Sequence, residues 1–386
     1  MFRFRARSPI PLIPLAFLTL ACGQPLPPAV VVPTSQAEQK TPAPATTSRP
    51  ADEKKPATPT TKPDDAAGSV RLGRTEPLPK KPGTMRLASY NVENLFDDKD
   101  DPSLSGQFED KDMTTPPERL AALAATIKRL DADVLAMTEI ESKDALVAFR
   151  DGYLKGLGYD HVASIDAGDP RGIEQAVLSR YPIVEATNWP QEDITDMQAK
   201  REGQGWATPS DGKWPKRWAR SPLLVRVKAA DGYELTLFVV HFKASKGFDA
   251  QREVEGLQTL QFVNERLAKN PNENLAILGD FNATPSAKSV KLFLDTESPR
   301  LRNSYDRRFQ PNAPSETYQT HVTNRPIDFI FMSPGLYKDT IDKSFFVLGT
   351  PLPPKNADRE APKPAGYASD HMPIAIDLET DVKKRG

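Results

Sequence analysis

Six short polar motifs, each at the end of an apolar run, constrain what this chain can fold into. The runs have the length of buried β-strands, and in open α/β architectures the side chains at strand ends gather at one edge of a sheet. Because the motifs are far apart in the sequence, the fold must bring distant segments together at one site. The motifs occupy residues 89–94 (SYNVEN), 138–139 (TE), 240–242 (VHF), 279–282 (GDFN), 327–329 (IDF) and 369–371 (SDH).

The motifs supply hard oxygen ligands and proton carriers. They contain carboxylates, carboxamides and histidines, and they contain no cysteine. Such ligands suit Mg²⁺, Mn²⁺ or Ca²⁺, and histidine transfers protons near neutral pH. The combination favours hydrolysis of a phosphate ester.

Composition limits the remaining choices. A chain of 386 residues forms one large domain or two small ones, and its formal net charge of -1 gives no overall attraction to polyanions. A nucleic acid would therefore have to be held by local patches. Cys22 is the only cysteine, which excludes an intrachain disulfide and a thiolate zinc site.

Residues 1–22 have the pattern of an export signal. A positive region precedes an apolar stretch at residues 9–21 that is too short to span a bilayer as a conventional helix. Residues 18–23 (LTLACG) resemble a bacterial lipobox in which Cys22 is lipidated, although Thr19 stands where leucine is usual. The alternative is an ordinary signal peptide. We expect an exported protein, anchored by lipid to a bacterial membrane in the periplasm or at the cell surface, or otherwise secreted.

The next segment, residues 23–84, contains no aromatic residue and is rich in Pro, Ala, Thr and Lys. It cannot bury enough apolar surface to offset its conformational entropy, so it is predicted to be a disordered tether. The catalytic domain is expected over residues 85–380, with a short tail at 381–386.

Alternating strand and helix patterns follow from residue 85 onward. Residues 85–90 and 133–137 are predicted strands on either side of an amphipathic helix that begins at Pro117. Residues 223–227 and 235–240 flank the pair Asp231 and Gly232, which is a strong hairpin signal. Further predictions are a helix at 250–267 and strands at 275–278, 327–332 and 374–378. Periodicity alone therefore predicts an α/β fold.

Taken in order, the motifs resemble the endonuclease/exonuclease/phosphatase superfamily, which contains deoxyribonuclease I, exonuclease III, neutral sphingomyelinases and inositol polyphosphate 5-phosphatases. The resemblance runs from about Met85 to about Leu378, and its most specific parts are residues 279–282 and 369–371. It implies a four-layered sandwich like that of deoxyribonuclease I, with two mixed β-sheets packed face to face and helices outside.

The resemblance also implies roles for single residues. Glu139 would be the principal metal ligand, with Asn91 beside it and Asp370 on the same side. Asp280 would orient or deprotonate a water, and Asn282 would donate to a phosphoryl oxygen, with both side chains pointing the same way along an extended segment. Each also has a structural alternative as a solvated strand end or a turn residue.

Two histidines need carboxylate partners. His371 would be held by Asp328, which fixes its tautomer and stabilises its charged form. For His241 the resemblance to deoxyribonuclease I suggests Glu174. Similarity to that enzyme's phosphate-contacting segment suggests Arg220, and Arg171 is a further candidate. His161 and His321 receive no role.

The sequence constrains the preferred substrate less than it constrains the catalytic residues. Glu141 and Gly172 stand where deoxyribonuclease I has residues that grip duplex DNA, so its mode of binding is not expected here. A polar insertion combines basic and aromatic side chains, which suits single-stranded or flexible nucleic acid. The alternative is an amphipathic loop packed on the domain. The insertion contains Trp206, Lys213, Trp214, Lys216, Arg217, Trp218, Arg220, Arg226 and Lys228.

The leading hypothesis is a divalent-metal-dependent nuclease that cleaves DNA or RNA by attack of an activated water. A phosphatase or a sphingomyelinase-like phospholipase with the same core is the second, and a catalytically silent binding module is the third. The sequence leaves open whether Asp280 or His371 is the general base. We infer no protein partner and expect a monomer.

Overall fold

The computed structural model describes residues 68–381 apart from 100–112, 201–206, 210, 230–231, 298–299 and 359–360. The chain separates into two units, residues 1–58 and 59–386, and every described residue belongs to the second. The predicted signal peptide, the lipidation site Cys22, the tether up to residue 67 and residues 382–386 of the tail lie outside the described residues.

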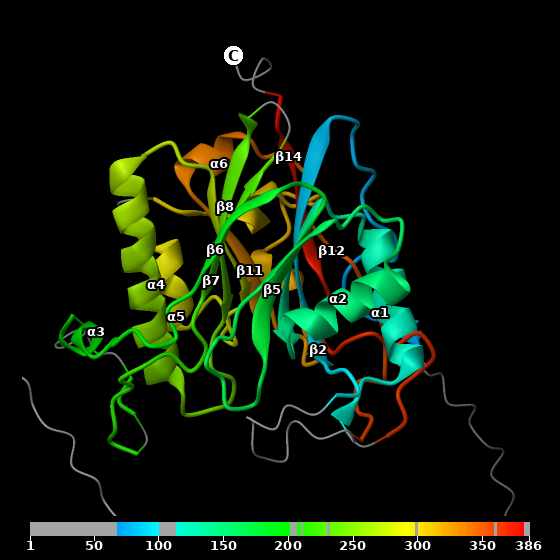
Figure 1. Cartoon of the computed structure of the whole chain (residues 1–386), viewed down its shortest axis with the longest axis horizontal. Coiled ribbons are helices and arrows are strands. Elements are labelled where there is room, and N and C mark those ends of the chain that lie inside the picture. Colours follow the sequence, from blue (N-terminus) through cyan, green and yellow to red (C-terminus); the bar gives the residue numbers. More distant parts are fainter. Residues whose placement is uncertain are drawn as a thin grey trace, which may run out of the picture. The chain divides into compact units, whose positions relative to one another are not determined.

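Two six-stranded mixed sheets form the centre of this unit (Figure 1). In each sheet one neighbouring pair is parallel, β2 with β3 and β8 with β9, and the other pairs are antiparallel. The first sheet has the order β12 (Phe346–Val347), β14 (Ile374–Glu379), β2 (Thr84–Leu95), β3 (Val134–Ile140), β5 (Glu174–Ser179) and β4 (His161–Ser164). The second has the order β10 (Arg302–Asn303), β11 (Asp328–Met332), β9 (Leu275–Asp280), β8 (Glu234–His241), β7 (Leu223–Lys228) and β6 (Ile183–Thr187).

Helices cover the outer face of each sheet (Figure 1). The helices α1 (Pro117–Leu130) and α2 (Lys143–Tyr153) pack on the first sheet, and α4 (Asp249–Lys269) and α5 (Lys288–Leu294) pack on the second. Short elements complete the described part, namely α3 (Asp196–Ala199), α6 (Pro334–Lys338) and two 3₁₀ turns at Ser304–Arg307 and Ser315–Thr317. The predicted four-layered α/β sandwich is confirmed.

Strand β3 shows why the predicted apolar runs are buried on both faces. Val134 and Ala136 belong to the core between the two sheets, whereas Leu135 and Met137 belong to the core beneath α1 and α2. Successive side chains on a strand point to opposite faces, so a strand covered on both sides must be apolar throughout. All of the strands and helices predicted from the sequence are present. The hairpin also pairs as expected, with Leu223 opposite Val239, although Asp231 lies outside the described residues.

Residues 68–84, predicted as the end of the tether, belong to the folded unit. The strand β1 (Ser69–Val70) pairs with β13 (Pro351–Leu352), and Leu72 and Leu78 are buried. Lys80 Nζ lies 3.0 Å from Asp133 Oδ1. The prediction was wrong here because these few apolar residues gain their burial from partners that are distant in the sequence.

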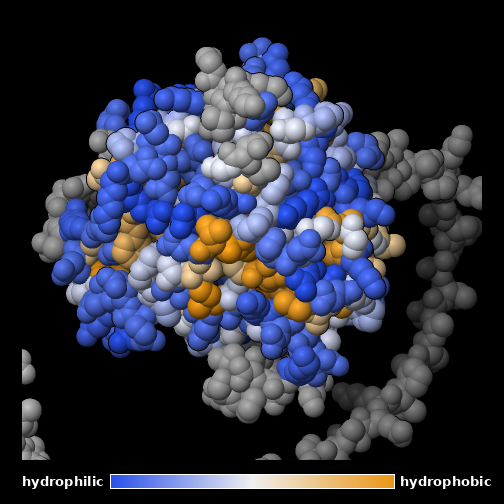
Figure 2. All heavy atoms as spheres, turned by 45° about the horizontal axis from the view of Figure 1, so that its top comes forward, coloured by the Kyte–Doolittle hydropathy of each residue, from blue (hydrophilic) through white to orange (hydrophobic). Residues whose placement is uncertain are grey.

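Large hydrophobic side chains are rarely exposed on the described residues. The exceptions are scattered over different elements: Met113, Tyr153, Val184, Phe248 and Phe309. On the face shown in Figure 2, hydrophilic residues predominate and hydrophobic ones form patches among them. None of the described helices has the length and apolarity needed to cross a membrane.

Candidate active site

The strand ends that carry the motifs are bent by bulges. The pairing of β2 with β3 shifts register between Asn91 and Leu95, and the pairing of β3 with β5 shifts between Thr138 and Ile140. Within these shifts the backbone of Glu139 is left-handed, with φ of 65°. A bulge re-aims a side chain, and a left-handed non-glycine residue stores about 1–3 kcal/mol of strain that the surroundings must compensate. The bulges direct Glu139 toward the second sheet.

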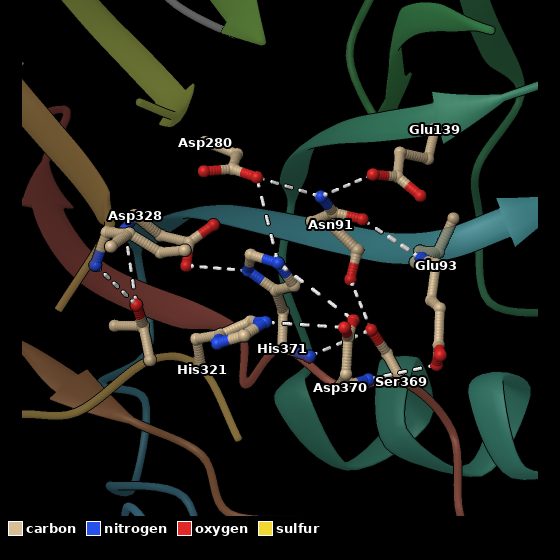
Figure 3. Close-up of polar contacts among 12 residues, drawn as sticks. Asn91, Glu93, Glu139, Asp280, His321, Asp328, Ser369, Asp370 and His371 are labelled. Atoms are coloured by element: carbon tan, nitrogen blue, oxygen red, sulfur yellow. Dashed lines mark hydrogen bonds and ion pairs between the residues drawn. The ribbon is translucent and has the colours of Figure 1, made fainter. Parts of the chain in front are cut away.

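Asn91 connects the two sheets at the centre of the site (Figure 3). Its Nδ2 donates to Glu139 Oε1 at 3.2 Å and to Asp280 Oδ2 at 3.1 Å. Its Oδ1 accepts a hydrogen bond from the backbone N–H of Glu93 at 3.0 Å. Three motifs that are remote in the sequence therefore meet as predicted.

Asp280 lies between two histidines. Its Oδ2 is 3.7 Å from Nε2 of His371 and 3.8 Å from Nε2 of His241. Burial raises the pKa of Asp280 to about 7; His371 opposes this rise, and the carboxylates of Asp328 and Glu139 add to it. A buried carboxyl with such a pKa can take up or release a proton near neutral pH.

The backbone between Asp280 and Asn282 differs from the extended segment that we predicted. The segment is not extended, because Asn282 has φ of 48° and its N–H donates to Asp280 Oδ1 at 2.7 Å in an Asx turn. Its Nδ2 donates to Asp280 Oδ2 and to the carbonyl of Phe242, both at 3.0 Å. The two side chains still converge.

Gly279 is also explained by packing. A Cβ at this position would collide with the carbonyl oxygen of Val240, and its φ is 137°. Close approach of β8 to β9 requires the glycine.

The predicted contact between His371 and Asp328 is present. His371 Nδ1 lies 2.9 Å from Asp328 Oδ2. Burial alone would lower the pKa of His371, but the carboxylates of Asp328 and Asp280 raise it well above its ordinary value. This ring is therefore held as a cation.

His241 has the opposite electrostatic environment. Its Nε2 lies 3.5 Å from Glu139 Oε1. Burial, followed by the positive charges of Arg220 and His371, lowers the pKa of His241 well below its ordinary value. The two rings that flank Asp280 are thus one neutral imidazole and one imidazolium.

The predicted partner of His241 was wrong. Glu174 lies opposite Ile140 in the register of β5 and accepts a hydrogen bond from the hydroxyl of Ser164. Within the described residues, Nδ1 of His241 is buried and has no hydrogen-bond partner. Burial raises the pKa of Glu174 to about 7. The side chain belongs to the edge of the first sheet and not to the histidine.

The predicted phosphate contact of Arg220 was also wrong. Its side chain is 1% exposed, and its Nε is paired with Asp169. Its Nη1 donates to the carbonyls of His241 and Phe242, each at 3.2 Å. Arg220 therefore positions the end of β8 from inside the protein. Arg171 is half-buried instead, and its Nη2 donates to Asn94 Oδ1 at 2.6 Å, close to Glu139.

Two residues without a predicted role also lie at the site. His321 Nε2 is 3.3 Å from Asp370 Oδ2, and the His321 and His371 rings have centroids 4.7 Å apart. Glu93 Oε2 accepts hydrogen bonds from the hydroxyl of Tyr367 at 2.6 Å and from the N–H of Asp370 at 3.0 Å. Glu93 stands within the first motif, so its position was a usable signal, whereas His321 stands in an irregular loop that gave none.

The residues present fit a divalent cation. Among the described residues, two groups have ligand atoms within 4.8 Å of one another, namely His321, Asp370 and His371, and Asp280, Asp328 and His371. Asp328 Oδ1 is buried and has no hydrogen-bond partner in the described part. The oxygen donors of these groups, the carboxylates of Asp280, Asp328 and Asp370, suit a hard cation. Glu139 belongs to neither group, but its Oε1 lies 3.2 Å from Nδ2 of Asn91.

The polar insertion is not one basic, aromatic surface. Trp218 is 7% exposed, and its ring centroid lies 6.2 Å from that of Phe262, so the alternative of a packed loop holds for it. Arg226 bonds to Glu185 and Glu234 on strands β6 and β8. Trp206 lies outside the described residues. The exposed basic members are Lys213, Lys216, Arg217 and Lys228.

Comparison with known proteins agrees with this geometry. Residues 88–371 match the Endonuclease/Exonuclease/phosphatase family, so the chain belongs to this family of phosphoester hydrolases. No curated protein matches the sequence.

Solved structures share the fold at low identity. The human Nocturnin catalytic domain with bound sulfate is similar at 17% identity with a TM-score of 0.53, over 76% of this chain and 94% of that chain. An endonuclease/exonuclease/phosphatase from Bacteroides vulgatus has 18% identity and a TM-score of 0.48, over 77% and 99%. The mannosyl-6-phosphatase of Bacteroides thetaiotaomicron has 20% identity and a TM-score of 0.46, over 76% and 98%.

Proposed function

We propose that the protein is an exported, divalent-metal-dependent nuclease that hydrolyses phosphodiesters in DNA or RNA. The observation that carries this proposal is the buried carboxylate of Asp280, whose Oδ2 lies 3.8 Å from Nε2 of His241 and 3.7 Å from Nε2 of His371. Export and membrane anchoring rest on residues 1–22 of the sequence.

The raised pKa of His371 and the lowered pKa of His241 support the following steps. Asp280, whose pKa is raised to about 7, accepts a proton from the attacking water. The imidazolium of His371 stabilises the charge that develops on the phosphoryl oxygens, and Asp328 holds that ring in place. Asn91, Glu139 and Asp370 would hold a divalent cation, which would neutralise further charge on the phosphoryl group.

A basic and aromatic rim beside His241 supports a polyanionic substrate. Lys243 follows the end of β8, and its Nζ lies 5.5 Å from the ring of Phe248, which is 43% exposed. Gln251, at the start of α4, donates to the carbonyl of Arg217 at 3.2 Å, which brings the basic insertion loop to the same rim. Cationic groups next to an exposed ring suit a nucleic acid strand better than a small monoester.

A substrate panel tests the proposal. The purified chain is offered plasmid DNA, single-stranded DNA, RNA, sphingomyelin vesicles and p-nitrophenyl phosphate, with Mg²⁺, Mn²⁺, Ca²⁺ or chelator. We expect metal-dependent cleavage of nucleic acid. Cleavage of only the lipid or the monoester would replace the nuclease with a phospholipase or a phosphatase.

Charge reversal at the rim adds a matched comparison. Lys246→Glu, in the loop after His241, should raise KM for nucleic acid, because it places a negative charge where the strand passes. Lys269→Glu, at the other end of α4, should not. Equal effects of the two substitutions on KM would mean that the rim does not contact the substrate.

A further inference from the structure

A cavity of about 300 Å³ lies between the segment that precedes β2 and the loop that leads to His321. Among the residues around it are two arginines, two aromatic residues and two glutamines. They are Arg71, Arg74, Phe309, Gln310, Tyr318 and Gln319. No residue of the mechanism above uses this cavity.

The cavity is joined to the site by direct contacts. Arg71 donates to Asn324 Oδ1 at 3.1 Å and to the carbonyl of Val322 at 3.2 Å. The N–H of Val322 donates in turn to the carbonyl of Asp370 at 2.8 Å. A bound group in this cavity would therefore lie one loop away from Asp370 and His321.

A second chain of contacts starts at Tyr318. Its ring centroid lies 6.1 Å from that of Tyr305, whose hydroxyl donates to the carbonyl of Asp328 at 3.2 Å. Two routes of contacts thus connect the lining of the cavity to the backbone of Asp370 and of Asp328.

The arginines are presented on a fixed backbone. The N–H of Arg74 donates to the carbonyl of Val347 at 2.8 Å, and its carbonyl accepts from Gly349 at 2.8 Å. Gly73 has φ of 74°, and a Cβ there would lie 2.8 Å from the N of Gly349. Close packing of this segment against residues 347–349 therefore holds the cationic side of the cavity in place.

The chemistry of the lining matches a nucleotide. The Arg74 guanidinium lies 4.6 Å from the centroid of the Phe309 ring, and that ring is 43% exposed. Gln319 Oε1 is buried and has no hydrogen-bond partner among the described residues, so it is an acceptor without a donor. Guanidinium groups bind phosphate, exposed rings stack on bases, and amide groups bond to base edges. A phosphate alone would not account for the ring or the buried acceptor.

We propose that this cavity binds one nucleotide unit of the substrate strand, with its phosphate on Arg71 and Arg74 and its base against Phe309. The inference rests on the proposed nuclease function. It makes the segment before β2 a part of the substrate site.

Two substitutions in the lining of the cavity test it. Phe309→Ala and Arg74→Gln are compared with Tyr153→Ala, an exposed aromatic residue on α2 that is 41% exposed. KM and kcat are measured on a labelled oligonucleotide and on methyl p-nitrophenyl phosphate, a diester too small to reach the cavity. We expect about a tenfold rise in KM for the oligonucleotide in both cavity variants, no change in kcat and no change for the small diester. An unchanged KM in both cavity variants would overturn the proposal.

A binding measurement separates failure of this inference from failure of the nuclease assignment. AMP is titrated into the Asp280→Asn chain, alone and combined with Phe309→Ala. Binding that weakens about tenfold with Phe309→Ala supports the nucleotide site even where no polynucleotide is cleaved. Absent binding, or binding indifferent to Phe309, contradicts the site whatever the substrate panel shows.

Discussion

His371 Nδ1 lies 2.9 Å from Oδ2 of Asp328, and the other oxygen of this carboxylate is buried with no hydrogen-bond partner in the described part of the chain. The negative charge of this carboxylate therefore stabilises the imidazolium of His371. The second ring of the site, His241, has cations around it instead, and its pKa is lowered. The site separates two histidines by charge state, which gives each a different task.

The first prediction concerns this pair. Asp328→Asn should lower the pKa of His371, because the negative charge that stabilises the imidazolium is removed. An NMR titration of the histidine ring in metal-free protein measures the shift, and turnover should fall by about a hundredfold or more. Asp342→Asn, at an exposed position that contacts Arg307, is the control. An unmoved His371 titration would contradict the assigned electrostatics.

The second prediction concerns the metal. Glu139→Gln keeps the shape of the side chain and removes its charge, so the Mg²⁺ concentration for half-maximal activity should rise by about tenfold or more. Activity measured against Mg²⁺ concentration gives this value. Glu118→Gln, at an exposed position in the first turn of α1, should leave the curve unchanged. A coincident curve for Glu139→Gln would remove that residue from the metal site.

The parts of the site that the sequence predicted share one property. Asn91, Asp280 and His371 stand at or near the ends of strands whose apolar runs are visible in the sequence, and strand ends meet wherever the sheets form. The left-handed backbone at Glu139 was not visible, because it depends on a bulge that only the paired strand defines. The turn at Asn282 is local, since its N–H donates to Oδ1 of Asp280, and a turn was among the alternatives that the sequence offered.

The residues assigned by similarity to another enzyme fared differently. Glu174 and Arg220 were each placed by a short neighbouring segment, yet the partner of Glu174 is set by strand register and that of Arg220 by burial beside Asp169. Both are properties of the tertiary structure. A short stretch of similar sequence therefore predicts such a partner only where the surrounding chain packs in the same way.

The third prediction concerns stability and pH. Glu255, on α4, is fully buried; its Oε1 accepts hydrogen bonds from the N–H of Ala219 at 2.6 Å and from Gln251 at 2.7 Å, whereas its Oε2 has no partner within the described residues. Burial raises the pKa of Glu255 to about 7 from 4.5. The protonated form is favoured in the folded state, so this contribution to stability is full below about pH 4.5 and is lost as the pH rises through about 7.

Replacing this carboxyl should therefore change the free energy of unfolding in a predictable direction. Glu255→Gln should raise the free energy of unfolding at pH 8 by up to about 3 kcal/mol and should change it little at pH 4.5. Urea unfolding at the two pH values gives the comparison. Glu265→Gln, at an exposed position of the same helix, should show no such difference. If Glu255→Gln instead destabilises the protein at pH 8, burial of the ionised carboxylate does not cost stability there.

The fourth prediction concerns the start of the folded domain. A chain that begins at Met85 lacks Leu72, Leu78 and the ion pair between Lys80 and Asp133. Each buried leucine contributes about 1.5–3 kcal/mol, so this chain should unfold at a markedly lower temperature than one that begins at Gly68. Calorimetry of both chains makes the comparison. Equal melting temperatures would mean that residues 68–84 add no stability to the folded domain.

The most direct test of the central claim is cleavage of labelled DNA and RNA by the wild-type chain and by Asp280→Asn, each with Mg²⁺ and with EDTA. We predict cleavage by the wild type that EDTA abolishes, and a loss of about a thousandfold or more in the variant with its melting temperature unchanged. Cleavage by Asp280→Asn at the wild-type rate, or wild-type cleavage that persists in EDTA, would contradict it.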